Sequence, residues 1–113
     1  MTLTTSTTGG ATLVALEGNL MGGPDAAALN AKLHELVESG KNQVILDLSR
    51  VQFLNSSGLG LLIGSVSTLK NAGGALKIAA ASEKILSLIK ITKLGGVFEF
   101  YPTVDAAAAS FKK

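Results

Sequence analysis

The segment Val44–Leu48 (VILDL) constrains the fold more than any other part of this chain, because Asp47 alone interrupts its apolar run. A strand with one wet face alternates apolar and polar residues, whereas a continuous apolar run predicts a strand covered on both faces. Apolar residues at helical spacing lie on either side of the segment. They are Leu29, Leu33, Leu36 and Val37 before it, and Leu59, Leu62, Ile63, Val66 and Leu69 after it. Strands that alternate with helices predict a largely parallel sheet with right-handed crossovers.

Turn and cap residues mark the other expected elements. Strands are expected at Leu3–Thr7, Ala11–Glu17, Leu76–Ile78 and Val97–Tyr101, the first two joined by a tight turn at Gly9-Gly10. Helices are expected to begin at Pro24, near Ser56 or Ser57, after Ser82 and after Thr103, and the first three to end at Gly40, Asn71–Gly74 and Gly95-Gly96. The order ββαβαβαβα predicts one α/β domain over residues 1–113. It has a mostly parallel five-stranded sheet, an N-terminal antiparallel hairpin and four helices.

Composition narrows the class of partner. The chain has 113 residues, a formal charge of +2 and no cysteine, and no Lys/Arg cluster is longer than two residues. A nucleic-acid partner is therefore not expected. The absence of cysteine excludes disulfides and thiol nucleophiles and fits a cytoplasmic protein. Neither a signal peptide nor an apolar stretch long enough to span a membrane is recognisable, so no membrane association is expected.

Catalytic constellations are scarce. The one histidine, His34, lies roughly 140° around its helix from the apolar stripe and is expected on the surface. Gly58-Leu59-Gly60 lacks the Gly-Lys-Ser/Thr of a P-loop, and neither Ser56 nor Ser57 stands in a Gly-x-Ser-x-Gly motif. The eight carboxylates form no recognisable acid/base pair. We therefore predict no catalytic residue, no metal site and no cofactor.

Asp47 is the one acid inside an otherwise apolar strand segment. A structural interpretation places its carboxylate at the end of the strand, where it accepts backbone N–H bonds and shapes the following loop. The alternative is a direct role in a phosphate or partner site.

The segment Phe53–Gly60 (FLNSSGLG) leads from an apolar strand through two serines into a helix with two early glycines. A serine at a helix start is explained by N-capping. The free N–H groups and the positive end of the helix dipole would also hold a phosphate on Ser56. We expect Gly58 and Gly60 to leave the backbone uncovered, so that a kinase or another protein can approach. Cap and switch therefore remain alternative interpretations.

Residues 47–60, DLSRVQFLNSSGLG, resemble the signature of STAS domains (sulfate transporter and anti-sigma factor antagonist), particularly the small stand-alone bacterial antagonists. The signature is a strand ending in Asp-Leu/Phe-Ser, then Asp-Ser-Ser/Thr-Gly-Leu-Gly at the start of a helix. Gly18-Asn19-Leu20 resembles the family's Gly-x-Leu turn before the first helix, and Asn71-Ala72-Gly73-Gly74 its Gly-Gly entry into the next strand. The predicted element order also matches the family's fold.

This resemblance implies a regulatory function. Such antagonists bind an anti-sigma factor, usually a serine kinase of the histidine-kinase-like ATPase fold, and so release a sigma factor. The kinase phosphorylates the serine after the signature Asp, here Ser56, and a PP2C-type phosphatase reverses this. A free antagonist of this kind is expected to be a monomer or weak dimer, and for Asp47 we adopt the structural interpretation given above. The residues implied at the switch loop and partner contact are Met21, Gly22, Asn55, Ser57, Gly58, Leu59 and Gly60.

The chain departs from the signature at two positions. Asn55 stands where the family usually has Asp, and Met21 follows the Gly-x-Leu turn where Asp is common. Asn keeps the size of Asp but loses its charge, so either the partner contacts a neutral residue or phosphorylation is weaker. The alternative functions are a nucleotide- or anion-sensing STAS module and a scaffold subunit of a stress-signalling assembly.

Overall fold

In a computed structural model that describes residues 2–91, 96 and 98–111, strands and helices follow one another in the expected order. The strands are β1 (Thr2–Thr8), β2 (Ala11–Leu20), β3 (Gln43–Leu54), β4 (Ala75–Ala79) and β5 (Phe100–Tyr101). The helices are α1 (Pro24–Glu38), α2 (Ser56–Asn71), α3 (Glu83–Ile91) and α4 (Val104–Phe111).

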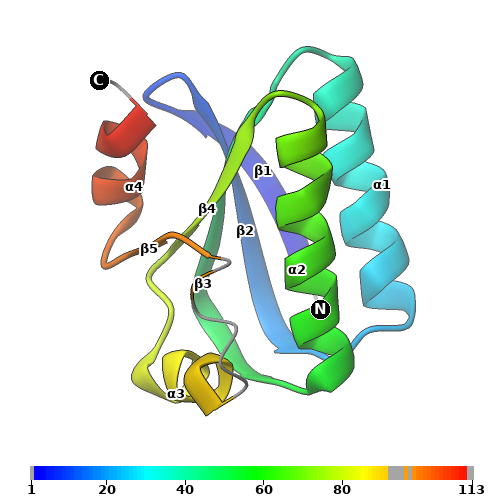
Figure 1. Ribbon diagram of the computed structural model, residues 1–113, viewed down its shortest axis with the longest axis vertical. Coiled ribbons are helices and arrows are strands. Elements are labelled where there is room, and N and C mark those ends of the chain that lie inside the picture. Colours follow the sequence, from blue (N-terminus) through cyan, green and yellow to red (C-terminus); the bar gives the residue numbers. More distant parts are fainter. Residues whose placement is uncertain (1, 92–95, 97, 112–113) are drawn as a thin grey trace.

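The five strands form one sheet in the order β1-β2-β3-β4-β5 (Figure 1). Only β1 and β2 pair antiparallel, through the turn at Gly9 and Gly10, whose φ angles are 56° and 86°. All other neighbouring pairs are parallel. The prediction of a mostly parallel sheet with an N-terminal hairpin is confirmed.

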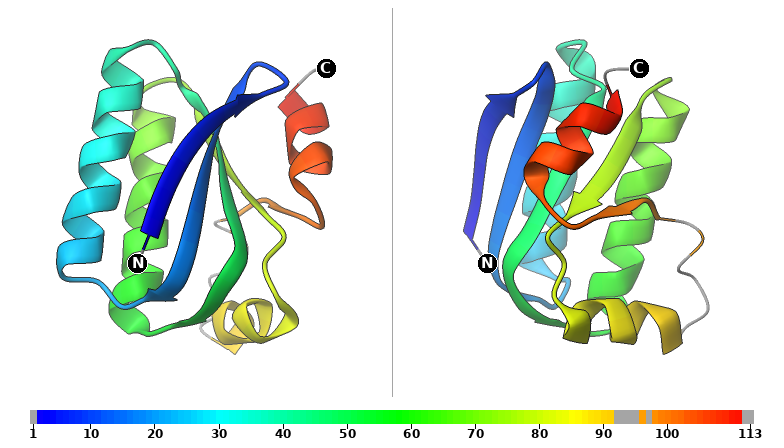
Figure 2. Two further views of the ribbon diagram at one scale, coloured as in Figure 1. Left: turned by 180° about the vertical axis from the view of Figure 1, so that it is seen from behind. Right: turned by 90° about the vertical axis from the view of Figure 1, so that its left-hand side faces the viewer.

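Helices cover the two faces of the sheet unequally. Figure 2 shows α1 and α2 side by side on one face, α4 on the other, and α3 at one end of the sheet. The first face holds the main core, which includes Val44, Leu46 and Leu48 of β3. Ile45 belongs to a smaller cluster under α4, with Ala79 and Ala107 among its members. The apolar segment is therefore covered on both faces, as predicted.

Most helix boundaries follow local chemistry. Pro24 is the first residue of α1. Ser82 Oγ accepts a hydrogen bond from Ile85 N at 3.2 Å, and Thr103 Oγ1 accepts one from Ala106 N at 3.0 Å. Each of these hydrogen bonds pairs one of the backbone N–H groups that the first turn of a helix leaves without a partner. The predicted caps of α3 and α4 are therefore confirmed.

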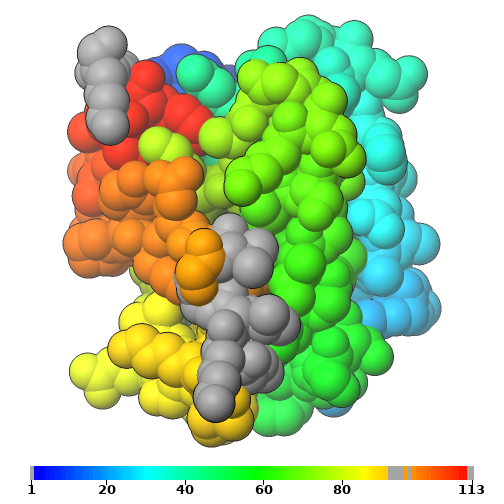
Figure 3. Space-filling view, viewed as in Figure 1, coloured from blue at the N-terminus to red at the C-terminus, as the bar shows by residue number. Residues whose placement is uncertain are grey.

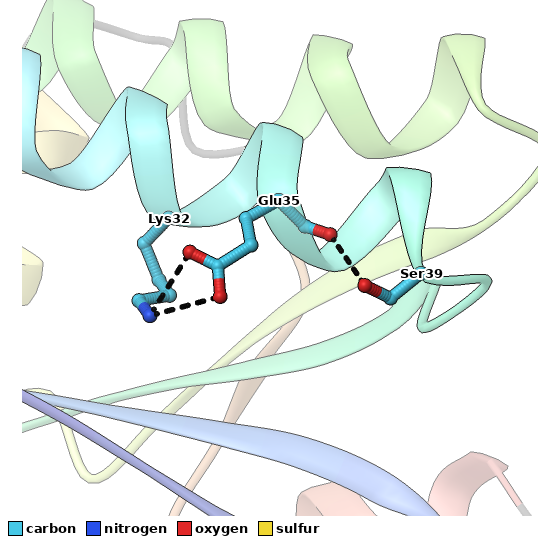
Figure 4. A network of polar contacts seen from close by, with 3 residues as sticks. All are labelled: Lys32, Glu35 and Ser39. Carbon is cyan, nitrogen blue, oxygen red and sulfur yellow. Dashed lines mark hydrogen bonds and ion pairs between the residues drawn. The ribbon is translucent and has the colours of Figure 1, made fainter.

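Figure 4 shows the polar contacts along the exposed side of α1. Lys32 Nζ lies 3.3 Å from Glu35 Oε2, and Ser39 Oγ donates a hydrogen bond of 2.9 Å to the carbonyl oxygen of Glu35. An exposed ion pair at this spacing contributes only about 0.2–0.5 kcal/mol, so α1 is held mainly by its buried leucines.

Three strands differ from the expectations by more than one residue at an end. β3 continues beyond Leu48 to Leu54, because its second half pairs with the end of β2 at Gly18 and Leu20 after shifts in register. Gly18-Asn19-Leu20 is thus strand and not turn. The last strand was expected at Val97–Tyr101, whereas β5 consists of Phe100–Tyr101. Val97 lies outside the described residues, as does Gly95 at the expected end of the third helix.

In the part of the chain that the structure describes, no helix has both the length and the apolarity needed to cross a membrane.

Candidate functional site

The loop between β3 and α2 consists of Asn55 alone. Its backbone is extended (φ −99°, ψ −174°), and its Oδ1 accepts a hydrogen bond of 2.8 Å from Gly58 N. Asn55 is therefore the N-cap of α2, and Ser56 is the first helical residue. The expectation that a serine caps this helix is wrong, because the capping side chain belongs to the residue before the first helical turn.

Asn55 also joins α2 to the segment that follows β2. Its Nδ2 donates to the carbonyl oxygen of Met21 at 3.4 Å, and its backbone N donates to the carbonyl oxygen of Leu20 at 3.3 Å. One residue thus fixes the start of the helix and the position of the neighbouring loop. The amide supplies both an acceptor and a donor, which a carboxylate cannot do.

Replacement of Asn55 separates these two contributions. We expect Asn55→Ala to lower the free energy of unfolding by about 1 kcal/mol, because it removes the cap. Asn55→Asp keeps the acceptor and gains roughly 0.3–1 kcal/mol from the helix dipole, but sets a carboxylate oxygen against the Met21 carbonyl. Urea unfolding should therefore place Asn55→Asp close to the wild type. An Asp variant as unstable as the Ala variant would contradict the capping role of the side-chain oxygen.

Gly58 is buried against the end of β2. A Cβ at this position would lie 2.0 Å from the carbonyl oxygen of Leu20 and 3.2 Å from Leu54 Cβ. The expectation that Gly58 leaves its backbone open to a partner is wrong, because the missing side chain makes room for Leu20. Gly22 is also buried, at φ +82°, and a Cβ there would lie 2.8 Å from Ser57 Cβ. Gly22 and Gly58 therefore have a structural role, because the lack of a side chain at each lets a neighbouring segment pack closely against it.

Other residues of the segment lie on the surface. Ser56 and Ser57 are exposed, as is Gly60, where a Cβ would meet nothing within 4 Å. Ser56 makes no side-chain hydrogen bond within the described part of the chain. In the space-filling view, α2 is exposed along one side of the molecule (Figure 3). The first turn of α2 thus presents two free hydroxyl groups and an open glycine.

A shallow apolar groove of about 300 Å³ adjoins Ser56. Its lining residues come from the end of β3, the start of α2 and the end of α3: Leu54, Asn55, Ser56, Leu59, Leu88 and Ile91. Only a small part of the Leu59 side chain lines the groove, because Leu59 is 6% exposed, whereas Ile91 is 77% exposed. Met21, held by Asn55, is 45% exposed and is the other large apolar side chain exposed among the described residues. An exposed apolar side chain at the edge of an apolar groove, as Ile91 is here, is typical of protein–protein contacts.

Sequence reasoning missed the contribution of α3 to the groove: Leu88 packs against the main core and also lines the groove beside Ile91. A signal was present, because Ile85, Leu86, Leu88, Ile89 and Ile91 make an apolar surface wider than one core-facing stripe needs. Only Ile85 and Ile89 are fully buried in α3.

Asp47 lies away from this groove. Its Oδ1 accepts a hydrogen bond of 2.9 Å from Ser49 N, within β3 and not at the strand's end as expected. Asp47 is the last β3 residue in register with β4, opposite Ala79. It lines a separate hollow with Glu17 and Arg50. The structure thus gives Asp47 a backbone-bonding position where the sheet becomes irregular.

Among the described residues, no catalytic side chain hydrogen-bonds to Ser56 or Ser57. His34 is exposed on α1, and no side chain other than Asn55 hydrogen-bonds within the first turn of α2 in the described residues. Over the same residues, no three His, Cys, Asp or Glu side chains are placed to hold a metal ion. The described residues that line the site are neutral, and most of them are small or apolar, beside a helix N-terminus.

A parallel sheet with one antiparallel edge strand, and a helix that begins at an exposed serine pair, define a small STAS-type domain. The family model of the STAS domain matches residues 2–107, and the chain belongs to this family. Its sequence is 28% identical over 112 residues to BtrV of Bordetella bronchiseptica, a proposed anti-sigma factor antagonist, covering 99% of this chain and 96% of BtrV.

Two solved structures share the fold. The crystal structure of a proposed anti-sigma factor antagonist from Thermotoga maritima superposes with a TM-score of 0.84 at 20% identity, over 98% of this chain and 95% of that one. The Bacillus cell fate determinant SpoIIAA in its phosphorylated form superposes with a TM-score of 0.71 at 20% identity, over 96% of this chain and 99% of that one.

Proposed function

We propose that this protein is an anti-sigma factor antagonist, a non-enzymatic regulator that binds a serine-kinase anti-sigma factor and is switched off by phosphorylation of Ser56. The observation that carries the proposal is the position of Ser56: exposed, at the first residue of α2, and on the lining of an apolar groove. A modification there changes the contact surface itself.

The unmodified surface suits a protein partner. Asn55, Ser56, Ser57 and Gly60 are neutral, and Met21 and Ile91 supply large exposed apolar side chains. A partner that covers the groove removes apolar surface from water without having to desolvate a charge. Among the expected contact residues, Met21, Asn55, Ser57, Leu59 and Gly60 retain some exposed surface or line the groove.

Phosphorylation would change this surface sharply. A phosphoserine carries about −1.5 to −2 charges at neutral pH. The unpaired N–H groups in the first turn of α2 would stabilise the phosphate where it forms, so the fold need not rearrange. Docking of the apolar partner surface would then bury a charge without a counter-ion, at a large cost in affinity.

The names of the relatives support this assignment. BtrV and the Thermotoga maritima protein are described as proposed anti-sigma factor antagonists, and SpoIIAA exists in a phosphorylated form. By extension, the partner of this chain would be an anti-sigma factor. Binding of that partner would free a sigma factor, and a PP2C-type phosphatase would restore the unphosphorylated state.

Phosphate mapping tests the site assignment. We expect incubation with ATP and the cognate kinase to add one phosphate to the wild type and to Ser57→Ala, and none to Ser56→Ala. Ser57→Ala is the matched control, since both serines are exposed in the same helical turn. Intact-mass and peptide mass spectrometry provide the readout. Phosphate on Ser57, or on neither serine, would contradict the proposal.

A further inference from the structure

β1 forms one edge of the sheet and has a partner on one side only. It pairs with β2 in an unbroken antiparallel register from Thr2–Glu17 to Thr8–Ala11. In the right-hand view of Figure 2, no other described element lies beyond it. Because alternate residues of an edge strand direct their N–H and C=O groups outward, about half of the backbone polar groups of β1 have no protein partner.

Proteins normally protect such an edge with a charge, a proline, a bulge or a covering element. β1 has none of these. Its sequence, TLTTSTT, contains neither charge nor proline, and the register with β2 shows no shift. The opposite edge, by contrast, has only the two residues of β5, which lead within three residues into α4. Among the described strands, β1 is therefore the edge strand with the longest run of unpaired backbone on one side.

The geometry points to a second copy of this chain as the occupant of this edge, through antiparallel β1–β1 pairing that makes one continuous ten-stranded sheet. A two-fold axis at Thr5 would set Thr5 opposite its own equivalent. The other facing pairs would be Thr2 with Thr8, Leu3 with Thr7, and Thr4 with Ser6.

This pairing is self-complementary in three respects. Every facing pair is neutral, so no like charges meet across the axis. Five of the seven residues are β-branched threonines, which favour extended backbone and pair well across strands. Seven paired residues would form about six to eight backbone hydrogen bonds, because three or four of the facing pairs exchange two bonds each.

The strand is also long enough to form a substantial contact. At about 3.3 Å per residue its seven residues extend roughly 23 Å, most of the way across a molecule whose principal extents are 31, 27 and 23 Å. The groove at Ser56 is formed by β3, α2 and α3, and does not include β1. A dimer formed at β1 would therefore carry two separate partner surfaces.

Lysine at the axis tests the proposal. Thr5 is exposed, so Thr5→Lys should fold normally while placing two ammonium groups opposite each other in the dimer. We expect sedimentation velocity to show a concentration-dependent dimer for the wild type, weakened by about tenfold or more in Thr5→Lys. Asn71→Lys, an exposed position at the end of α2, is the charge-matched control and should dimerise like the wild type.

A mixing experiment separates charge repulsion from local damage to β1. Thr5→Lys and Thr5→Asp should each be mainly monomeric, whereas an equimolar mixture should dimerise again, because opposite charges then face each other across the axis. Circular dichroism checks that both variants are folded. The proposal is overturned if the wild type stays monomeric at every concentration. The edge would then be open to a strand from another protein. Equal dimerisation of the wild type and Thr5→Lys also overturns it.

Discussion

Gly58→Ala is expected to lower the free energy of unfolding by roughly 3 kcal/mol or more, the upper range of costs for overpacking a protein interior. The added Cβ would lie 2.0 Å from the carbonyl oxygen of Leu20, which is backbone and cannot rotate away. Either α2 or the end of β2 must shift, and the Asn55 hydrogen bonds to Gly58 and Met21 shift with it. Typical domains are stable by only about 5–15 kcal/mol, so this is a large fraction.

Gly60→Ala is the matched control, two residues further along the same helix. A Cβ at Gly60 would meet nothing within 4 Å, and alanine is the better helix former by about 0.5–1 kcal/mol. Urea unfolding should therefore place the two variants on opposite sides of the wild type. Equal midpoints for Gly58→Ala and Gly60→Ala would show that the contact with Leu20 does not constrain α2.

Ser56→Asp is expected to weaken binding of the anti-sigma partner by about tenfold to a hundredfold relative to Ser56→Ala, which corresponds to roughly 1.4–2.8 kcal/mol. The aspartate places a charge on the lining of the apolar groove, where it loses its hydration when the partner docks. Both variants should fold, because Asn55 and not Ser56 caps α2. Aspartate in the first turn is itself stabilised by the helix dipole.

Ser57→Asp controls for the charge alone. It adds the same charge to the same turn, but Ser57 does not line the groove. Calorimetric titration of the kinase with the three variants should give the smallest affinity loss for Ser56→Ala, an intermediate one for Ser57→Asp and the largest for Ser56→Asp. Equal affinities for Ser56→Asp and Ser56→Ala would show that charge at this position is not the signal.

The dimer contact and the phosphorylation switch are physically separate, so their tests are independent. Loss of the dimer in Thr5→Lys changes no residue of the Ser56 groove. Loss of partner binding in Ser56→Asp changes no residue of β1. Measurement of both properties on both variants therefore distinguishes failure of one proposal from failure of the other.

The sequence by itself determined the order of the elements and most helix starts, because these depend on local chemistry. The apolar run Val44–Leu48 and the leucine stripe of α1 specify which faces are buried. Ser82 and Thr103 cap their own helices within three residues. These signals need no knowledge of distant contacts.

Tertiary structure alone decided the details of the site, because these depend on segments far apart in the chain. The burial of Gly58 is set by Leu20, and the orientation of Asn55 by Met21, each more than thirty residues away. The groove at Ser56 likewise needs Leu88 and Ile91 of α3. A glycine that opens the backbone to solvent and one that admits a neighbouring carbonyl look alike in sequence, and only the packing of β2 against α2 distinguishes them.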